Sequence, residues 1–175
     1  RARIAEIVER IRAAEPPGRG VRWVRLDGLH VTLRFLGPTP DDRIDAVADA
    51  IRRAAEGVPP FRIVIHDAGA FPASGRPRTL WLAIRDGRDE LATLAARLGS
   101  GLVDAGWPDD DRPFRAHLTL ARADGVRAGR DTASALKAAA ADLTLESSAD
   151  RLVLFESITG GGPARYVERA VARLG

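Results

Sequence analysis

The sequence has no cysteine and no methionine, and of its 27 basic residues only Lys137 is a lysine. Without cysteine the chain can form no disulfide, thiolate nucleophile, thiolate-bound zinc site or iron–sulfur cluster. Because no methionine is present to start translation, we expect the 175 residues to begin after the natural start and to lack their native N-terminal strand. No apolar run approaches the roughly 20 residues of a membrane span, and no signal-peptide pattern opens the chain. A cytoplasmic protein without membrane attachment is therefore the default expectation.

The composition is that of an ordinary globular protein, with 45 % hydrophobic residues, 29 % charged residues and a formal net charge of +3. At 175 residues the chain is long enough for one domain with its own core. Arginine keeps its proton to very high pH and binds phosphate oxygens through two parallel N–H groups. The excess of arginine over lysine suits an anionic partner, although a GC-rich genome would give the same bias.

Hydrophobic periodicity predicts an alternation of helices and strands along the whole chain. Apolar residues spaced by three and four indicate helices over 2–15, 41–55, 91–106 and 133–141. Runs rich in β-branched, aromatic and leucine residues indicate strands over 21–25, 29–36, 61–66, 80–84, 114–121 and 152–158. We expect 164–174 to be the hairpin partner of the last strand, although its spacing also fits a helix. Asp27-Gly28 is typical of a hairpin or a tight turn between the first two strands. The order predicts an α+β (α/β) chain with mainly antiparallel pairing.

One internal repeat connects the two halves of the chain. Leu29-His30-Val31-Thr32-Leu33 recurs 87 positions later as Ala116-His117-Leu118-Thr119-Leu120, and both copies lie on predicted strands. A solenoid would need at least three copies. Two copies, one in each half, instead predict two antiparallel-sheet lobes related by a pseudo-twofold axis, with outer helices and a central groove.

Strand alternation separates the polar and apolar residues of each copy. Successive strand residues point to opposite faces. The apolar residues must face the core, which places Phe35 on the core side of the first copy. In each copy the histidine and threonine then share the open face with a neighbouring arginine. The two sets are His30, Thr32 and Arg34, and His117, Thr119 and Arg115.

Two histidines and two threonines on facing surfaces suit one kind of chemistry. An imidazole changes its charge near neutral pH, so one neutral and one protonated histidine can accept and donate protons in the same reaction. Threonine hydroxyls and arginine guanidiniums can hold phosphate oxygens as charge develops on them. The pattern predicts acid–base phosphoryl transfer on a phosphodiester, with no metal.

Other chemistries lack their motifs. The two repeated histidines have no further ligands at zinc-site spacing, and no nucleophile elbow, Walker or dinucleotide-binding glycine motif is present. We expect His66, which has no threonine two residues on, to have a structural or surface role. Gly160-Gly161-Gly162 favours a hairpin turn, and Asp109-Asp110-Asp111 a solvated loop tip.

The residues around the two copies resemble a known family. The stretches 29–37 (LHVTLRFLG) and 112–122 (RPFRAHLTLAR) resemble the two signatures of the two-histidine phosphoesterases. Within that superfamily they are most similar to the bacterial and archaeal RNA 2′,3′-cyclic phosphodiesterases, also called 2′-5′ RNA ligases (LigT-like). Stretches 70–72, 77–82 and 152–157 are similar too, so the resemblance covers nearly the whole chain. The sequence departs from the family at Ala116, where proline is common, and lacks the short apolar strand with which the family usually opens.

The resemblance implies a bilobal fold and hydrolysis of an RNA 2′,3′-cyclic phosphate end to a 2′-phosphate, without cofactor or metal. By analogy, His30 would be the general acid that protonates the departing 3′ oxygen, and His117 the general base that activates water. Thr32, Thr119 and Arg122 would bind the phosphate. Strict alternation places Arg122 on the face opposite His117, so it could take part only if the strand ends or bulges there.

Further contacts with RNA follow from the same resemblance. Arg34 and Arg115 are candidates for the RNA backbone, and Trp23, Trp81 and Phe155 for stacking on a base, with core packing expected for at least two of these three.

Two alternatives stay open at this point. The domain over 1–175, which we expect to be a monomer, could be a module that binds RNA ends without turnover. It could also be a phosphodiesterase of a small cyclic nucleotide. Reversible 2′-5′ ligation could accompany hydrolysis.

Overall fold

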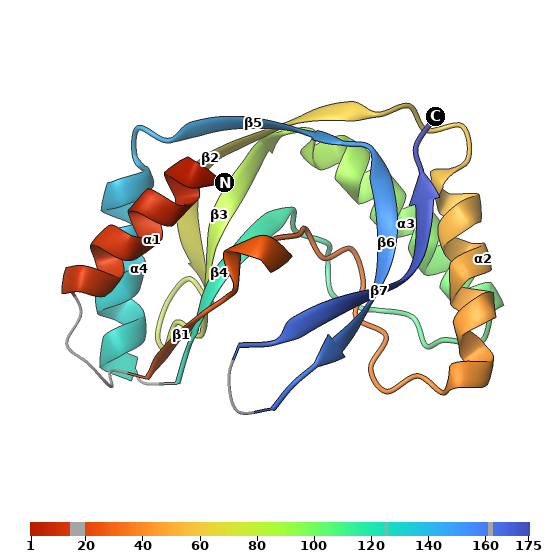
Figure 1. Cartoon of the computed structure of the whole chain (residues 1–175), viewed down its shortest axis with the longest axis horizontal. Helices are drawn as coiled ribbons and strands as arrows, with labels where there is room; N and C mark the ends of the chain where they lie inside the picture. The colour runs from red at the N-terminus through yellow and green to blue at the C-terminus, as the bar shows by residue number, and fades with distance from the viewer. Residues whose placement is uncertain (15–19, 125, 161–162) are drawn as a thin grey trace.

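Two antiparallel sheets with four α-helices on their outer sides make up the described residues, 1–14, 20–124, 126–160 and 163–175, of the computed structural model (Figure 1). The elements in chain order are α1 (Ala2–Ala14), β1 (Val21–Trp23), the 3-10 turns η1 (Leu26–Gly28) and η2 (Asp41–Arg43), α2 (Ile44–Ala55), β2 (Phe61–Phe71), β3 (Thr79–Asp86), α3 (Arg88–Asp104), β4 (His117–Ala123), α4 (Val126–Ala140), β5 (Thr144–Ala149), β6 (Arg151–Ile158) and β7 (Arg165–Arg173). Among these residues no helix has the length and apolar character that a membrane crossing requires.

The larger sheet has the strand order β1-β4-β3-β2-β5, with every neighbouring pair antiparallel. One face of this sheet packs against α1 and α4, which lie side by side on the left in Figure 1. Leu80 and Leu82 of β3 and Leu120 of β4 are fully buried in this core, because alternate strand residues point towards the helices. The other face is left for polar and aromatic side chains.

The smaller sheet is the hairpin β6–β7, which packs against α2 and α3. Asp150 alone separates β5 from β6, so the chain passes from one sheet to the other at this residue. In Figure 1 the two sheets form an arch, and the chain from β1 through η1 runs beneath it. This second core holds the apolar side of α2, including Val47, Ala50 and Ile51, with Leu98 and Leu102 of α3.

Most predicted elements are confirmed. The helices predicted from apolar spacing form as α1, η2 with α2, α3 and α4. The segment over 164–174 is a strand, β7, paired with β6 along its length, so the alternative of a helix there is wrong. Gly161 and Gly162 lie outside the described residues.

Of the two alternatives predicted at Asp27-Gly28, the tight turn is confirmed, since the Gly28 N–H donates to the Arg25 carbonyl, and the hairpin is wrong. β1 pairs with β4, and Asp27-Gly28 lies in η1 instead of a hairpin turn. Segment 29–36 forms one isolated antiparallel bridge, from Val31 to Leu118, and no strand. The alternation of polar and apolar residues suits a strand, but a strand also needs hydrogen bonds to a neighbouring backbone. In this segment only Val31 has such a neighbour. The core placement of Phe35 is also wrong, because that side chain is 67 % exposed.

Element boundaries also differ from the predictions. β2 continues to Phe71, two residues past the start of the predicted loop at Gly69, and α4 begins at Val126 instead of residue 133. β4 begins at His117, so Phe114 precedes it. The mainly polar β5 was not predicted; it forms because it pairs with β2 along its full length.

Candidate functional site

The two His-x-Thr copies meet at a single antiparallel bridge. Val31 and Leu118, the bridged pair, are equivalent positions of the repeat, 87 residues apart. Antiparallel pairing of equivalent residues brings the residue before one towards the residue after the other. His30 therefore lies towards Thr119, and Thr32 towards His117. The two copies are therefore neighbours that lie side by side.

His117 and Thr119 occupy the open face of the larger sheet. They pair directly with Ala83 and Trp81 of β3, and paired residues in an antiparallel ladder share a face. Leu118, between them, is buried on the core face. His117 is half-buried, as is His30, so both imidazoles are within reach of a ligand.

Arg122 returns to the face of His117 because β4 contains a bulge. The pairing between β3 and β4 skips Leu120, which is an extra residue on β4. A bulge reverses the alternation beyond it, so Arg122 is exposed and lies opposite Thr79, to whose Oγ1 its Nη1 donates a hydrogen bond of 3.3 Å. The face given by strict alternation is thus wrong, and Arg122 shares a face with His117.

Both imidazoles are held in the same way. His30 Nδ1 lies 2.7 Å from the carbonyl oxygen of Gly28, and His117 Nδ1 lies 2.6 Å from that of Arg115. A carbonyl oxygen can only accept, so each Nδ1 carries hydrogen and donates it. In both rings Nε2 is then the atom left for proton exchange with a ligand.

Aromatic rings surround each imidazole, and they come from different elements. His30 contacts Tyr166 of β7 at 4.6 Å and Phe155 of β6 at 5.5 Å between ring centroids. His117 contacts Phe71 of β2 edge-on at 5.1 Å, and Trp81 lies beyond at 6.1 Å. The rings restrict both imidazoles to one orientation.

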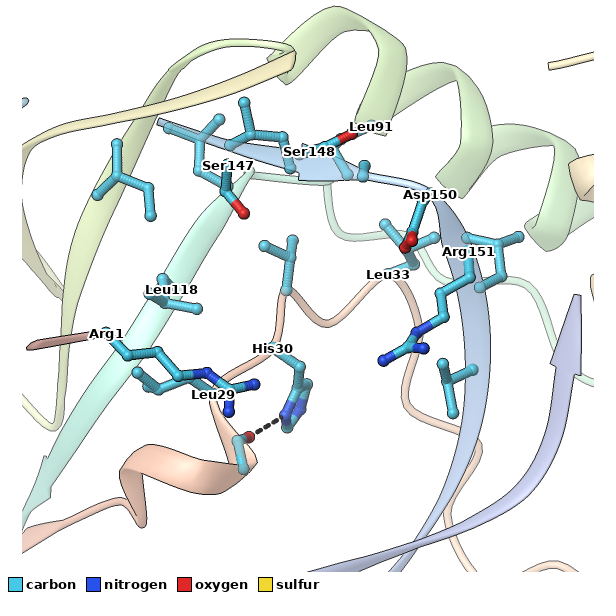
Figure 2. Close-up of a pocket in the computed structure, with 18 of the residues that line it drawn as sticks. Arg1, Leu29, His30, Leu33, Leu91, Leu118, Ser147, Ser148, Asp150 and Arg151 are labelled. Carbon is cyan, nitrogen blue, oxygen red and sulfur yellow. Dashed lines mark hydrogen bonds between the residues drawn. The ribbon is translucent and has the colours of Figure 1, made fainter. Parts of the chain in front are cut away.

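The two histidines line neighbouring cavities that share Leu33. His30 lies in a cavity of about 560 Å³ beneath β5 and β6, which is lined by polar residues such as Ser147, Ser148 and Asp150 and by apolar residues such as Leu33 and Leu118. Figure 2 shows His30 joined to Gly28 and the Arg151 side chain extending from β6 into this cavity. His117 and Thr32 line a cavity of about 820 Å³ that extends to α3.

The two arginines predicted to contact RNA have different surroundings. Arg115 is exposed, with its guanidinium 5.7 Å from the centre of the Phe71 ring. The Arg34 side chain is only 12 % exposed; it donates to the carbonyl of Pro108 and lies 3.6 Å from Asp110. The structure therefore ties Arg34 to the acidic loop.

Asp109 and Asp111 of that loop are exposed, as the prediction of a solvated loop tip requires, whereas Asp110 is half-buried. Asp110 also accepts a hydrogen bond of 2.9 Å from Nε of Arg112. The Arg112 guanidinium holds the pKa of the Asp110 carboxyl below its usual value, with Arg34 contributing more weakly. Asp110 links two arginines and fixes one wall of the cavity that contains His117.

The three aromatic residues predicted as candidates for base stacking, and His66, have different surroundings. Trp23 packs against the core of the larger sheet, whereas Trp81 lies on the face of Thr119 and contacts Phe71. The indole Nε1 atoms of both are buried without a hydrogen-bond partner among the described residues. Phe155 lies beside His30. His66 Nδ1 donates to the carbonyl of Leu143 at 2.9 Å and so ties β2 to the start of β5. That contact is structural.

Two residues near the site were not found from the sequence. Tyr166 touches His30 from a hairpin more than a hundred residues away, and Arg22 pairs directly with Arg122 across β1 and β4. Neither belongs to a recognisable motif. Tyr166 could have been predicted to lie near Phe155 only from the pairing of the last two strands, β6 and β7. Within the described ranges, no three His, Asp or Glu side chains gather as a metal site.

Matched His-x-Thr segments side by side, each with its histidine held through Nδ1 so that Nε2 is left for a ligand, are the arrangement expected of a two-histidine phosphoesterase. Residues 1–161 match the family model of the 2′-5′ RNA ligase superfamily, and the chain belongs to that superfamily.

Curated relatives carry the name RNA 2′,3′-cyclic phosphodiesterase. The chain is 36 % identical to the Escherichia coli protein over 121 residues, which is 67 % of this chain and 66 % of the relative. It is 34 % identical to the Thermus thermophilus protein over 131 residues, 70 % of this chain and 62 % of the relative. The match to the Archaeoglobus fulgidus protein is 33 % over 103 residues, 59 % of this chain and 56 % of the relative. The matches thus span less than two thirds of each of these relatives.

Solved structures are similar over almost the whole chain. A protein from Thermus thermophilus superposes with a TM-score of 0.75 at 25 % identity, covering 99 % of this chain and 91 % of that one. Escherichia coli LigT in complex with 3′-AMP gives a TM-score of 0.70 at 28 % identity, covering 97 % and 92 %. The mixed fold with curled antiparallel sheets is therefore that of LigT-like proteins.

Proposed function

We propose that this chain hydrolyses the 2′,3′-cyclic phosphate at the end of an RNA and releases a 2′-phosphate. The observation that carries the proposal is the bridge between Val31 and Leu118, which sets two equivalent His-x-Thr segments side by side. The matched hydrogen bonds from Nδ1 of His30 and His117 leave two Nε2 atoms for proton transfer. The names of the curated relatives support the same substrate.

The reaction uses one imidazole in each protonation state. Nε2 of neutral His117 takes a proton from water as the water oxygen bonds to phosphorus. The bond from phosphorus to the 3′ oxygen breaks, and protonated His30 gives its Nε2 proton to that oxygen. The products are a 2′-phosphate and a 3′-hydroxyl, and proton exchange with solvent restores both rings.

The phosphate is held between the two copies. The hydroxyls of Thr32 and Thr119 donate to its non-bridging oxygens, and the Arg122 guanidinium offsets the charge that grows in the transition state. The bulge at Leu120 supports this role for Arg122, because it returns that side chain to the face of His117. Arg115, exposed above Phe71, is suited to the RNA backbone.

Two further expectations accompany the proposal. Each chain contains both copies of the motif, so one chain suffices for catalysis and we expect a monomer. RNA as substrate fits a cytoplasmic enzyme. The same groups can join a 2′,3′-cyclic phosphate to a 5′-hydroxyl: this hydroxyl takes the place of water as the nucleophile, the bond from phosphorus to the 3′ oxygen breaks as in hydrolysis, and a reversible 2′-5′ linkage results.

The test is turnover of an RNA oligonucleotide that ends in a 2′,3′-cyclic phosphate, in the presence of a metal chelator. We expect a product ending in 2′-phosphate, identified by mass spectrometry and by resistance to an enzyme specific for 3′-phosphates. His30→Ala and His117→Ala should each lower kcat by about 10²- to 10⁴-fold while the thermal unfolding midpoint stays near that of the wild type.

The two alternative functions give different results in the same assay. Binding of the oligonucleotide without product would support an RNA-end-binding module. Turnover of a 2′,3′-cyclic mononucleotide with no turnover of the oligonucleotide would support a small-molecule phosphodiesterase. Full activity in either histidine variant would refute the mechanism.

A further inference from the structure

We infer that an arginine patch at the far end of β4, formed by Arg22 and Arg76 beside Arg122, binds backbone phosphates of the RNA on the 5′ side of the cyclic end. This inference rests on the proposed function and extends it, because it says where the rest of the RNA lies. Arg22 is on the same sheet face as His117, as the pairing of β4 with β1 and β3 shows, and Arg76 reaches the end of β4 from the loop before β3.

The pairing of β1 with β4 creates an electrostatic imbalance. Arg22 lies directly opposite Arg122, and paired residues share a face. Two like charges at directly opposed positions destabilise a sheet unless something of opposite charge lies between or beside them. Asp124 supplies part of that charge, since its carboxylate lies 3.0 Å from Nη2 of Arg22, with both side chains more than half exposed.

The other two guanidiniums contact neutral oxygens. Arg122 donates to the Thr79 hydroxyl, and Nη2 of Arg76 donates to the backbone carbonyl of Asp124 at 2.6 Å. Neither contact neutralises the charge. All three arginines are exposed. Three cations beside one carboxylate form a surface suited to a polyanion, and arginine is the side chain best suited to phosphate.

One phosphate cannot contact both Thr119 and the arginine patch, because they are too far apart along β4. Arg22 and Arg76 both contact Asp124, which lies four strand positions beyond Thr119 when the extra residue Leu120 is left out, or about 13 Å along the direction of β4. The Arg122 side chain leans across to β3, where it bonds Thr79. A phosphate bound by Arg22 and Arg76 is therefore a different group from the one at Thr119. An RNA strand provides such a second phosphate, and a cyclic mononucleotide does not.

The test compares two substrates in the double variant Arg22→Ala/Arg76→Ala. With an oligonucleotide ending in a 2′,3′-cyclic phosphate, we expect kcat/KM to fall roughly tenfold at low salt. The slope of log(kcat/KM) against log[salt] should become shallower by about 0.7 for each phosphate that the variant no longer binds. With a 2′,3′-cyclic mononucleotide, kcat/KM should stay within about twofold of the wild-type value. Arg52→Ala/Arg53→Ala on α2, outside the patch, removes the same number of positive charges and is the control.

Equal loss with both substrates would overturn the inference, because the arginines would then support the catalytic face itself. No loss with either substrate would also overturn it. A binding measurement keeps the test independent of turnover: fluorescence anisotropy of an oligonucleotide ending in 2′-phosphate, followed at several salt concentrations. If the wild-type protein has no activity at all, the proposed function fails, while weaker and less salt-dependent binding by the double variant would still support the patch.

Discussion

The ring of Tyr166 meets the imidazole of His30 edge-on, with 4.6 Å between ring centroids and 76° between ring planes. The same tyrosine packs on Gly28, where an added Cβ would come within 3.2 Å of Tyr166 Cδ2. Because the Gly28 carbonyl accepts the Nδ1–H of His30, Tyr166 touches both the imidazole and the peptide that orients it. The last hairpin of the chain therefore positions a histidine in the first half.

Tyr166→Ala should lower kcat roughly tenfold with KM nearly unchanged, since an aromatic pair of this geometry contributes about 0.5–1.5 kcal/mol beyond its buried area. Tyr166→Phe keeps the ring and should retain activity within about twofold. Steady-state kinetics with the cyclic-phosphate oligonucleotide checks both. If Tyr166→Phe loses as much as Tyr166→Ala, the phenol hydroxyl and not the ring is what matters, and the positioning role is wrong.

Arg122→Ala should lower kcat/KM by about 10²-fold with the oligonucleotide and with a cyclic mononucleotide alike, because the guanidinium acts on the reacting phosphate. Arg122→Lys keeps the charge but loses the planar two-pronged contact, so partial recovery is expected. Kinetics with both substrates decides the matter. A loss confined to the oligonucleotide would instead assign Arg122 to the arginine patch.

Gly69→Ala should destabilise the fold by about 1–3 kcal/mol, because overpacking forces neighbours apart. A Cβ at Gly69 would come within 2.4 Å of two carbon atoms of the Trp81 ring. Trp81 contacts Phe71 and lies near His117, so activity should fall as well. Urea unfolding followed by tryptophan fluorescence measures the change.

The matched control is Gly99→Ala on α3, where an added Cβ meets nothing within 4 Å. This change should stabilise the protein by about 0.5–1 kcal/mol, because alanine is the better helix former. Equal stability of Gly69→Ala and the wild type would show that Trp81 can move aside, which would contradict the tight packing beneath His117.

Asp110 should titrate below the ordinary pKa of aspartate, about 3.9, because the Arg112 guanidinium hydrogen-bonds its charged form, with Arg34 adding a weaker attraction. A lowered pKa in the folded state means that the stabilisation is present above the unfolded value and is lost as the pH falls through the folded one. An NMR titration of the Asp110 carboxyl carbon measures the midpoint. In Arg112→Ala the midpoint should rise, and an unchanged midpoint would refute the link.

The sequence predicts the helices and the paired motifs well, for identifiable reasons. The apolar spacing of Ile4, Ile7 and Ile11 and of Leu91, Leu94 and Leu98 is that of helices with one buried side, and these residues are buried. The repeat at His30 and His117 is visible because it recurs with its neighbours. Such signals are local, so they need no knowledge of which segments pair.

What the sequence could not predict depends on pairing. Segment 29–36 has the alternation of a strand but forms only the bridge at Val31, because no second strand backbone lies along the rest of it. The face of Arg122 depends on the bulge at Leu120. A bulge is an extra residue relative to the partner strand, so it cannot be predicted from the sequence of β4 alone. Tyr166 and Arg22 reach the site only through the arrangement of the strands.

The measurement that tests the central claim most directly uses a cyclic-phosphate oligonucleotide in which sulfur replaces the departing 3′ oxygen. A thiolate leaves without being protonated, so it does not need a general acid, whereas the attacking water still needs a base. We predict that His30→Ala is slow on the oxygen substrate but reaches nearly the wild-type rate on the sulfur substrate. His117→Ala should be slow on both substrates. Recovery of His117→Ala but not of His30→Ala, or of neither variant, would contradict the roles assigned to the two histidines.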